Sequence, residues 1–314
     1  MVEDNQIKAQ VSPFAIREGE IKTFDGKDGY VSMNQIVHKI NIGHITDIHF
    51  AILELVNQFE FITSRQLYQM LEIKGIDAKS QDKLNNKLEA LVKSKILTRY
   101  YFTSEEGKGI YRIYCLEKMG KYLLNSKEIE CKWQPSDNTK PVPMIKKRLA
   151  GNQTLIAYLR KVKAFDDFVV KPSLTAKTAG KVFKATGGSV KLTKKQKNKK
   201  SIQFLFEVIR REPDWKKKLV EKMRLYQDFY ANFVPGDSGF STMPQLIFVC
   251  EDEKHMAETF KEIITNQVEI PQLKLYFTTD LRQNEETLEN TLVEFKLVDG
   301  KYKMENIELK LLGM

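Results

Sequence analysis

Glu207 is the residue whose type and position could most directly support catalysis, because it is the one acid in the apolar strand pattern 202–209. Metal-dependent phosphodiester cleavage needs two or three carboxylates around a divalent cation and a lysine close by. Nuclease folds supply them from a hairpin, with an acid on one strand and acid-x-lysine on the next. Here the lysine position is Ile209, and 188–191 contains no acid. The nearby acid patterns belong to a predicted helix: Pro213-Asp214 and Glu221-Lys222. We therefore predict no catalytic residue, with Glu207 as a weak candidate.

Other patterns for catalysis or metal binding are missing from the sequence. It contains no Walker loop, no GxGxxG and no GxSxG. Neither the histidines nor the cysteines stand at ligand spacings, so we predict no metal and no cofactor. Three widely spaced cysteines argue against disulfides and for a reducing compartment. These residues are His38, His44, His49, His255, Cys115, Cys131 and Cys250.

Lysine is concentrated between Phe168 and Phe206, a segment without any acid. Its ten lysines equal the formal net charge of +10 of the whole chain, so the remainder is balanced. Lysine binds DNA phosphates electrostatically, and we predict such contacts for the densest run. The alternative is a solvated loop, because runs of like charge often have no fixed structure. The run comprises Lys194, Lys195, Lys197, Lys199 and Lys200.

A second group of DNA-binding residue types lies on a helix predicted to begin after Ser80. Leu84, Leu88 and Leu91 recur at helical spacing and would face the core. Lysine and amide side chains are those that contact phosphates and base edges, although lysine is also common on solvated helix faces. The predicted outward residues are Lys79, Gln81, Lys83, Asn86 and Lys87. A hairpin after the helix adds Arg99, Lys108 and Arg112, offset by Glu105 and Glu106.

The elements that position this helix are predicted over 44–130. One apolar helical pattern runs from Ile45 to Phe59, and Thr63 with Gln66 forms a capping box for a second helix. The third helix is followed by strand-like runs Ile96–Phe102 and Ile110–Leu116. Three helices and a two-stranded hairpin are the order of a winged helix-turn-helix, whose third helix enters the major groove. A closing helix is expected over 117–124.

The flanking segments are predicted from turn and breaker residues. Residues 1–43 contain Asp25-Gly26 and Asp28-Gly29, which leaves a short hairpin or a flexible arm open. Residues 131–144 carry Pro135, Pro141 and Pro143 among polar residues, which predicts a linker rather than an element.

The remaining 145–314 predict an α/β domain. A basic amphipathic helix is expected over 145–162, a strand over 165–170, and short strands at 182–183 and 190–192 joined by Thr186-Gly187-Gly188. The strand 202–209 follows, then a helix after Pro213, a strand at 246–250, a helix at 254–265 and a strand at 273–277. This order of helices and strands matches the PD-(D/E)xK nuclease-like fold. Asp299-Gly300 predicts a final hairpin between 292–297 and 302–309.

Several stretches resemble the replication-relaxation proteins of plasmids and conjugative elements in Gram-positive bacteria, over roughly Ile45 to Leu281. The resemblance implies a winged helix joined to a degenerate nuclease-like domain that acts at replication or transfer origins. That family usually places an acid two residues after the strand glutamate and another on the preceding strand, from which Ile209 and 188–190 depart. The stretches are Phe61-Ile62-Thr63-Ser64-Arg65-Gln66-Leu67, Leu88–Arg99, Tyr114–Leu124, Phe204-Leu205-Phe206-Glu207, Lys222–Tyr226 and Leu246-Ile247-Phe248-Val249.

Together these patterns predict an α+β chain with a winged helix-turn-helix at 44–130 and an inactive PD-(D/E)xK-like α/β domain at 145–314. The expected function is DNA binding for a mobile element, in replication, conjugative transfer or their regulation. The alternatives are a transcriptional regulator, a metal-dependent nuclease or relaxase-like enzyme, and a protein-binding adaptor. Expected partners are double-stranded DNA, replication or transfer proteins and a second copy of the chain. A polar start and no apolar run of about 18–20 residues predict a cytoplasmic protein without a membrane partner.

Overall fold

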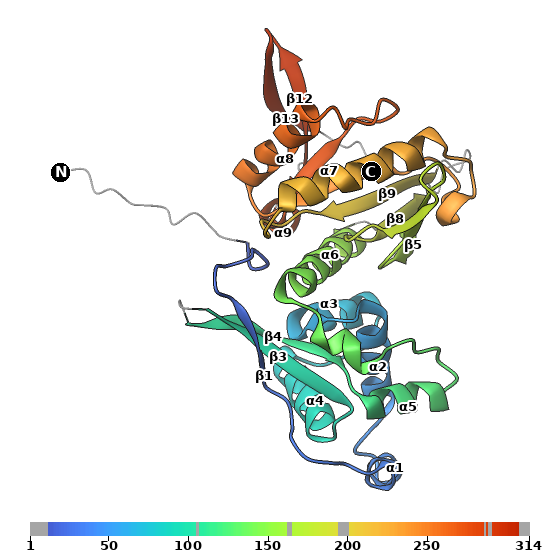
Figure 1. Ribbon diagram of the computed structural model, residues 1–314. Coiled ribbons are helices and arrows are strands. Elements are labelled where there is room, and N and C mark those ends of the chain that lie inside the picture. Colours follow the sequence, from blue (N-terminus) through green and yellow to red (C-terminus); the bar gives the residue numbers. More distant parts are fainter. Residues whose placement is uncertain are drawn as a thin grey trace, which may run out of the picture.

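The computed structural model describes residues 12–104, 107–161, 165–193, 201–285, 287 and 291–307. These residues form a mixed α and β structure, as predicted. Figure 1 shows two parts, one around a four-stranded sheet and the other around a seven-stranded sheet, with helix α6 (Val142–Lys161) between them. No helix within these ranges is long and apolar enough to cross a membrane.

The helices and hairpin predicted for the amino-terminal part are confirmed. Thr63 and Gln66 make the reciprocal capping-box bonds, at 3.1 and 3.2 Å, and Ser80 caps the third helix. These interactions satisfy backbone N–H groups that a helix start leaves unpaired, so each helix begins where the sequence predicts. The elements are α2 (Asp47–Phe59), β2 (Ile62–Thr63), α3 (Ser64–Ile73), α4 (Gln81–Lys93), β3 (Leu97–Ser104), β4 (Gly107–Leu116) and α5 (Lys118–Ser126).

Residues 12–43 form neither the hairpin nor the flexible arm left open for this segment. β1 (Ile21–Phe24) pairs antiparallel with β3, which gives the sheet order β1-β3-β4-β2. The two Asp-Gly turns that follow lead into α1 (Met33–Asn41) instead of a second strand. The prediction missed this pairing because the partner of β1 is distant in sequence. Residues 1–11 lie outside the described ranges.

The predicted linker at 131–144 is wrong in one respect, because it contains structure of its own. The 3-10 helix η1 (Pro135–Thr139) buries Asn138, whose side chain accepts from the Trp133 indole and donates to the Leu116 carbonyl. These bonds fix the segment against the end of β4. Helix α6 also begins within the predicted linker, at Val142.

The carboxy-terminal part is a seven-stranded sheet of order β13-β12-β11-β10-β9-β8-β5. β9, β10 and β11 are parallel neighbours, and the other pairs are antiparallel. The predicted strands and helices occur in the predicted order, but β11 begins three residues later than the predicted 273–277, and the strand at 173–176 and α9 were not predicted. The bounds are β5 (Phe165–Val169), β8 (Ser189–Thr193), β9 (Ser201–Val208), β10 (Gln245–Cys250), β11 (Tyr276–Thr279), β12 (Leu292–Val298), β13 (Lys301–Ile307), α7 (Trp215–Ala231), η2 (Asp237–Gly239), α8 (Glu253–Thr265) and α9 (Asp280–Glu285).

Both faces of the sheet are covered. Phe204 and Phe206 pack toward α6 in one core, while Leu205 and Phe248 pack toward α7 and α8 in the other. The strand β9 is therefore buried on both sides, as expected for parallel strands beneath helices.

The two short strands predicted within the lysine-rich segment do not pair with each other. β7 (Lys181–Lys184) pairs with β6 (Ser173–Ala176) in a separate ribbon that packs on α7, whereas β8 joins the main sheet. Local patterns located both strands, but only packing of Leu174 and Phe183 decided their partners.

Helix α6 was predicted to be amphipathic, yet it is buried nearly all round. The cause is its position between α3 and the large sheet. Gln66 donates to the Leu149 carbonyl at 2.8 Å, and Asn152 donates to the Phe61 carbonyl at 2.7 Å. One hydrophobic core consequently runs from α2 and α3 through α6 to β9.

Candidate nucleic-acid interface

The exposed face of α4 carries some of the residues predicted to contact DNA. Lys83 and Asn86 are exposed, while Lys87 is half-buried beside α2. Burial and the charge of Lys87 lower the pKa of His49. Lys79 is exposed in the turn before the helix. This face thus combines a cation with an amide that could reach a base edge.

Gln81 has a structural role within the same face. Its amide donates to the Ser64 carbonyl at 3.3 Å and to Asn85 at 3.2 Å, which ties α4 to the start of α3. Asn85 and Arg65 are both exposed and were missed by the sequence reasoning. Asn85 could have been found from its spacing of four residues from Gln81, and Arg65 from its position in the first turn after the Thr63 cap.

The two arginines of the hairpin are already paired within the chain. Arg99 pairs with Glu89 of α4, and its Nε lies 2.9 Å from an Asp25 carboxylate oxygen; the Arg99 side chain is only 12% exposed. Arg112 is half-exposed and its Nε also lies 2.9 Å from Asp25. Asp25 therefore neutralises part of the hairpin. The side chain of Lys108, and Glu105 and Glu106, lie outside what the structure describes.

The lysine-rich segment is described only up to Thr193, so the run Lys194, Lys195, Lys197, Lys199 and Lys200 lies outside the described residues. Of the other lysines, Lys181 and Lys184 are exposed on β7. Lys177 pairs with Asp237 at 2.7 Å, and Lys171 pairs with Glu60. Burial lowers the pKa of Lys171 to about 8. The ribbon therefore offers two accessible cations.

Glu207 points toward α7 and is buried. One carboxylate oxygen accepts from Thr186 Oγ1 at 2.9 Å and from Lys222 Nζ at 2.7 Å, and the other accepts from Tyr226 Oη at 2.7 Å. In the sequence Lys222 stands next to Glu221 and 15 residues from Glu207, and helix packing brings it to Glu207. Burial, followed by the Glu207 charge, raises the pKa of Tyr226 well above its ordinary value.

The surroundings of Glu207 do not assemble the ligands of a cation site. Its oxygens are occupied by protein donors, and no group of three acids, histidines or cysteines suited to a metal occurs among the residues that the structure describes. The arrangement supplies a hydrogen-bonded buried carboxylate that joins β9 to α7.

A second polar cluster lies at the carboxyl ends of β9, β10 and β11. Arg210 is fully buried and donates two hydrogen bonds to Asp280, at 2.7 and 2.8 Å, while Ser12 donates to the same carboxylate. Lys146 of α6 pairs with Glu20 at 2.5 Å. The segment 12–20 thus lies across this sheet edge and occupies its charged groups. The sequence analysis did not predict this cluster, because Ser12, Arg210 and Asp280 are far apart along the chain.

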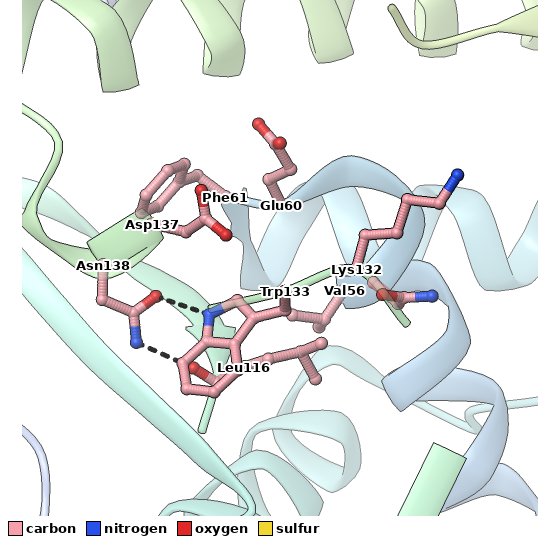
Figure 2. A pocket seen from close by; sticks show the side chains of 9 residues that line it. Val56, Glu60, Phe61, Leu116, Lys132, Trp133, Asp137 and Asn138 are labelled. Carbon is pink, nitrogen blue, oxygen red and sulfur yellow. Dashed lines mark hydrogen bonds between the residues drawn. The ribbon is translucent and has the colours of Figure 1, made fainter. Parts of the chain in front are cut away.

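A cavity of about 240 Å³ lies between the end of α2 and the segment 132–138 (Figure 2). Glu60 there is the centre of a γ-turn, with φ 65° and ψ −61°, and Phe61 N donates to the Phe59 carbonyl at 2.9 Å. Lys140 Nζ lies 3.0 Å from Asp137 and 3.7 Å from Glu60, so both acids at the cavity have cationic partners. The lining residues are Val56, Asn57, Glu60, Phe61, Leu116, Lys132, Trp133, Asp137 and Asn138.

No family model, curated protein or solved structure that we compared with the chain matches it.

Proposed function

We propose that the chain is a DNA-binding protein in which residues 44–130 form a winged helix and α4 enters the major groove. The observation that carries this proposal is the succession α2, β2, α3, α4, β3 and β4, with Lys83 and Asn86 exposed on α4. A helix held on a packed helix pair can present side chains to base edges, and cations beside them can bind phosphates.

The carboxy-terminal part would add affinity without cleaving DNA. Its core order α6, β5, β8, β9, α7 and β10 supports a nuclease-like PD-(D/E)xK assignment. The acid expected on β8 is missing, and Glu207 is bonded to Lys222 and Tyr226. Exposed Lys181 and Lys184, with the lysine run at 194–200, would contact phosphates.

A role in plasmid replication, conjugative transfer or their regulation extends the proposal. It is supported by the resemblance to replication-relaxation proteins, and the DNA site would distinguish these roles. A site within an origin would favour replication or transfer, whereas a site within a promoter would favour transcriptional control.

The test is binding of the full chain to the DNA flanking its own gene and to random DNA, measured by fluorescence anisotropy at several salt concentrations. We expect a preferred fragment that still binds at about 150 mM salt, where the Debye length is about 8 Å. Asn86→Ala should weaken binding to that fragment by roughly 5- to 150-fold and reduce its preference over random DNA. Lys83→Ala should weaken binding to all DNA and lower the salt slope by about one.

Lys254→Ala is the matched control, because Lys254 is an exposed lysine on α8. Equal affinity of wild type and the two α4 variants for the preferred fragment would contradict the placement of α4 in the groove. Equal affinity for all fragments, lost as the salt concentration rises, would mean that the chain binds DNA only through a basic surface and recognises no site. Absence of DNA binding together with a tight protein partner would instead favour an adaptor.

A further inference from the structure

The hairpin formed by β12 and β13 leaves the main sheet soon after it begins. Only Val293 of β12 is paired with β11, opposite Phe277, whereas β12 and β13 stay paired from Leu292↔Ile307 to Val298↔Lys301. Figure 1 shows the two strands projecting from the top of the molecule. Among the described strands β13 has a neighbour on one side only, so the backbone of its other edge is available for pairing.

One face of this hairpin is apolar and exposed. Leu297 is 63% exposed, Tyr302 49% and Met304 40%, and the strand register places all three on the same face. Phe295 continues that face toward the core, where its ring stacks on Phe260 with 4.2 Å between centroids. An apolar face continuous with the interior, beside an unpaired edge, is typical of an interface rather than of scattered surface residues.

The opposite face of the hairpin carries charges that are not matched within one chain. The register puts Lys296 opposite Lys303 and Glu294 opposite Glu305, and like charges in opposite positions are unfavourable. Glu294 and Glu305 both pair with Lys296, at 2.8 and 2.7 Å. Lys303 has no acidic partner in the part of the chain that the structure describes.

We propose that two copies of this chain associate by antiparallel pairing of their β13 strands about a two-fold axis centred on Met304. Such pairing places Lys303 opposite Glu305 of the second copy, twice by symmetry, and supplies the acid that Lys303 lacks. It also places Tyr302 and Met304 of both copies on one continuous apolar face. The contact is isologous, as closed dimers require, and it joins two seven-stranded sheets into one.

Other registers of the same strand are unfavourable. Centring the pair on Lys303 or on Glu305 brings two like charges together at the axis. A shift of one residue between the strands places apolar side chains of one copy beside polar side chains of the other. The charges of β13 therefore select one antiparallel register.

The experiment is sedimentation equilibrium of the full chain without DNA, from nanomolar to high micromolar concentration. We expect wild type to be a dimer and Met304→Lys to be weakened by at least about tenfold, because two lysines would meet at the axis. Val182→Lys is the matched control, since Val182 is 69% exposed on the β6–β7 ribbon. Circular dichroism checks that each variant is folded.

Charge reversal separates this pairing from a general loss of solubility or fold. Lys303→Glu should weaken the dimer, and the double variant Lys303→Glu/Glu305→Lys should restore it. Within one chain the double variant places opposite charges across the hairpin at both positions, so the hairpin itself should be retained. A monomeric wild type, an unaffected Met304→Lys variant, or a double variant that stays as weak as Lys303→Glu would each overturn the proposal. None of these outcomes depends on DNA binding.

Discussion

Nε of Arg99 lies 2.9 Å from a carboxylate oxygen of Asp25. Arg99 is on β3, and Asp25 directly follows β1. The same carboxylate lies 2.9 Å from Nε of Arg112 on β4. An acid contributed by the segment before residue 44 therefore pairs with two arginines of the β3–β4 hairpin. If this hairpin meets DNA, Asp25 lowers its attraction for phosphates.

We predict that Asp25→Asn tightens DNA binding, because half-exposed Arg112 is then available to phosphates. The gain should reach roughly tenfold at about 0.1 M salt for one added phosphate contact, with a steeper salt slope. Anisotropy titrations against one DNA fragment at several salt concentrations measure both quantities. Asp28→Asn is the control, since Asp28 is exposed in the same turn region. Equal gains in the two variants would show only a change in net charge.

Glu207→Gln is predicted to reduce stability rather than to abolish a reaction. The substitution removes the charge to which Lys222 and Tyr226 are bonded and should lower the free energy of unfolding by about 3 kcal/mol. Urea unfolding with and without magnesium measures this loss, and Glu221→Gln on α7, where Glu221 is exposed, is the control. Magnesium-dependent plasmid nicking by wild type that is lost in a folded Glu207→Gln variant would contradict the structural assignment.

His255 is predicted to make the protein less stable in mild acid. Burial, then the charges of Arg211 and Arg210, lower the pKa of His255 to about 3, whereas the unfolded chain has an ordinary value of 6.5. Because the unfolded state binds the proton more tightly, stability is present above that ordinary pKa and is lost as pH falls toward the folded value. The slope approaches about 1.4 kcal/mol per pH unit. His49, whose pKa is also lowered, acts in the same direction.

Urea unfolding of wild type and His255→Leu at about pH 7 and about pH 5 measures this dependence. In the variant, the free energy of unfolding should fall less steeply between these two pH values, by the contribution of one proton, even if the variant is less stable at neutral pH. His44→Gln is the control, because His44 is exposed. An unchanged pH slope in His255→Leu would refute the assignment.

Gly188 is predicted to be required for close packing as well as for backbone conformation. Its φ is 84°, and an added Cβ would lie 2.7 Å from a Leu155 methyl carbon and 2.8 Å from the Val169 carbonyl oxygen. Gly180 has a similar φ of 62° but no atom within 4 Å of such a Cβ. Gly180→Ala should therefore cost about 1 kcal/mol of unfolding free energy, and Gly188→Ala at least about 3 kcal/mol. Equal losses in urea unfolding would mean that conformation alone matters.

Local signals in the sequence accounted for the elements whose causes are also local. Thr63 and Gln66 cap α3, Ser80 caps α4, and Asp299-Gly300 turns between β12 and β13 with positive φ at both residues. The alternating apolar residues of 202–208 form β9 as predicted. Caps, turns and hydrophobic periods act over a few neighbouring residues, so one sequence is enough to locate them.

The tertiary structure alone decided which distant residues meet. Helical periodicity could not show that α6 lies between two layers and is buried nearly all round, or that β1 adds to the edge of β3. Spacing along the chain separated Lys222 from Glu207 and Asp25 from Arg99, and only packing brought each pair together. Long-range contacts depend on the summed burial of whole elements, and no short pattern records that sum. The sequence by itself therefore determined the elements that have local signals and the polar face of α4, whereas packing determined which charged residues are free to bind.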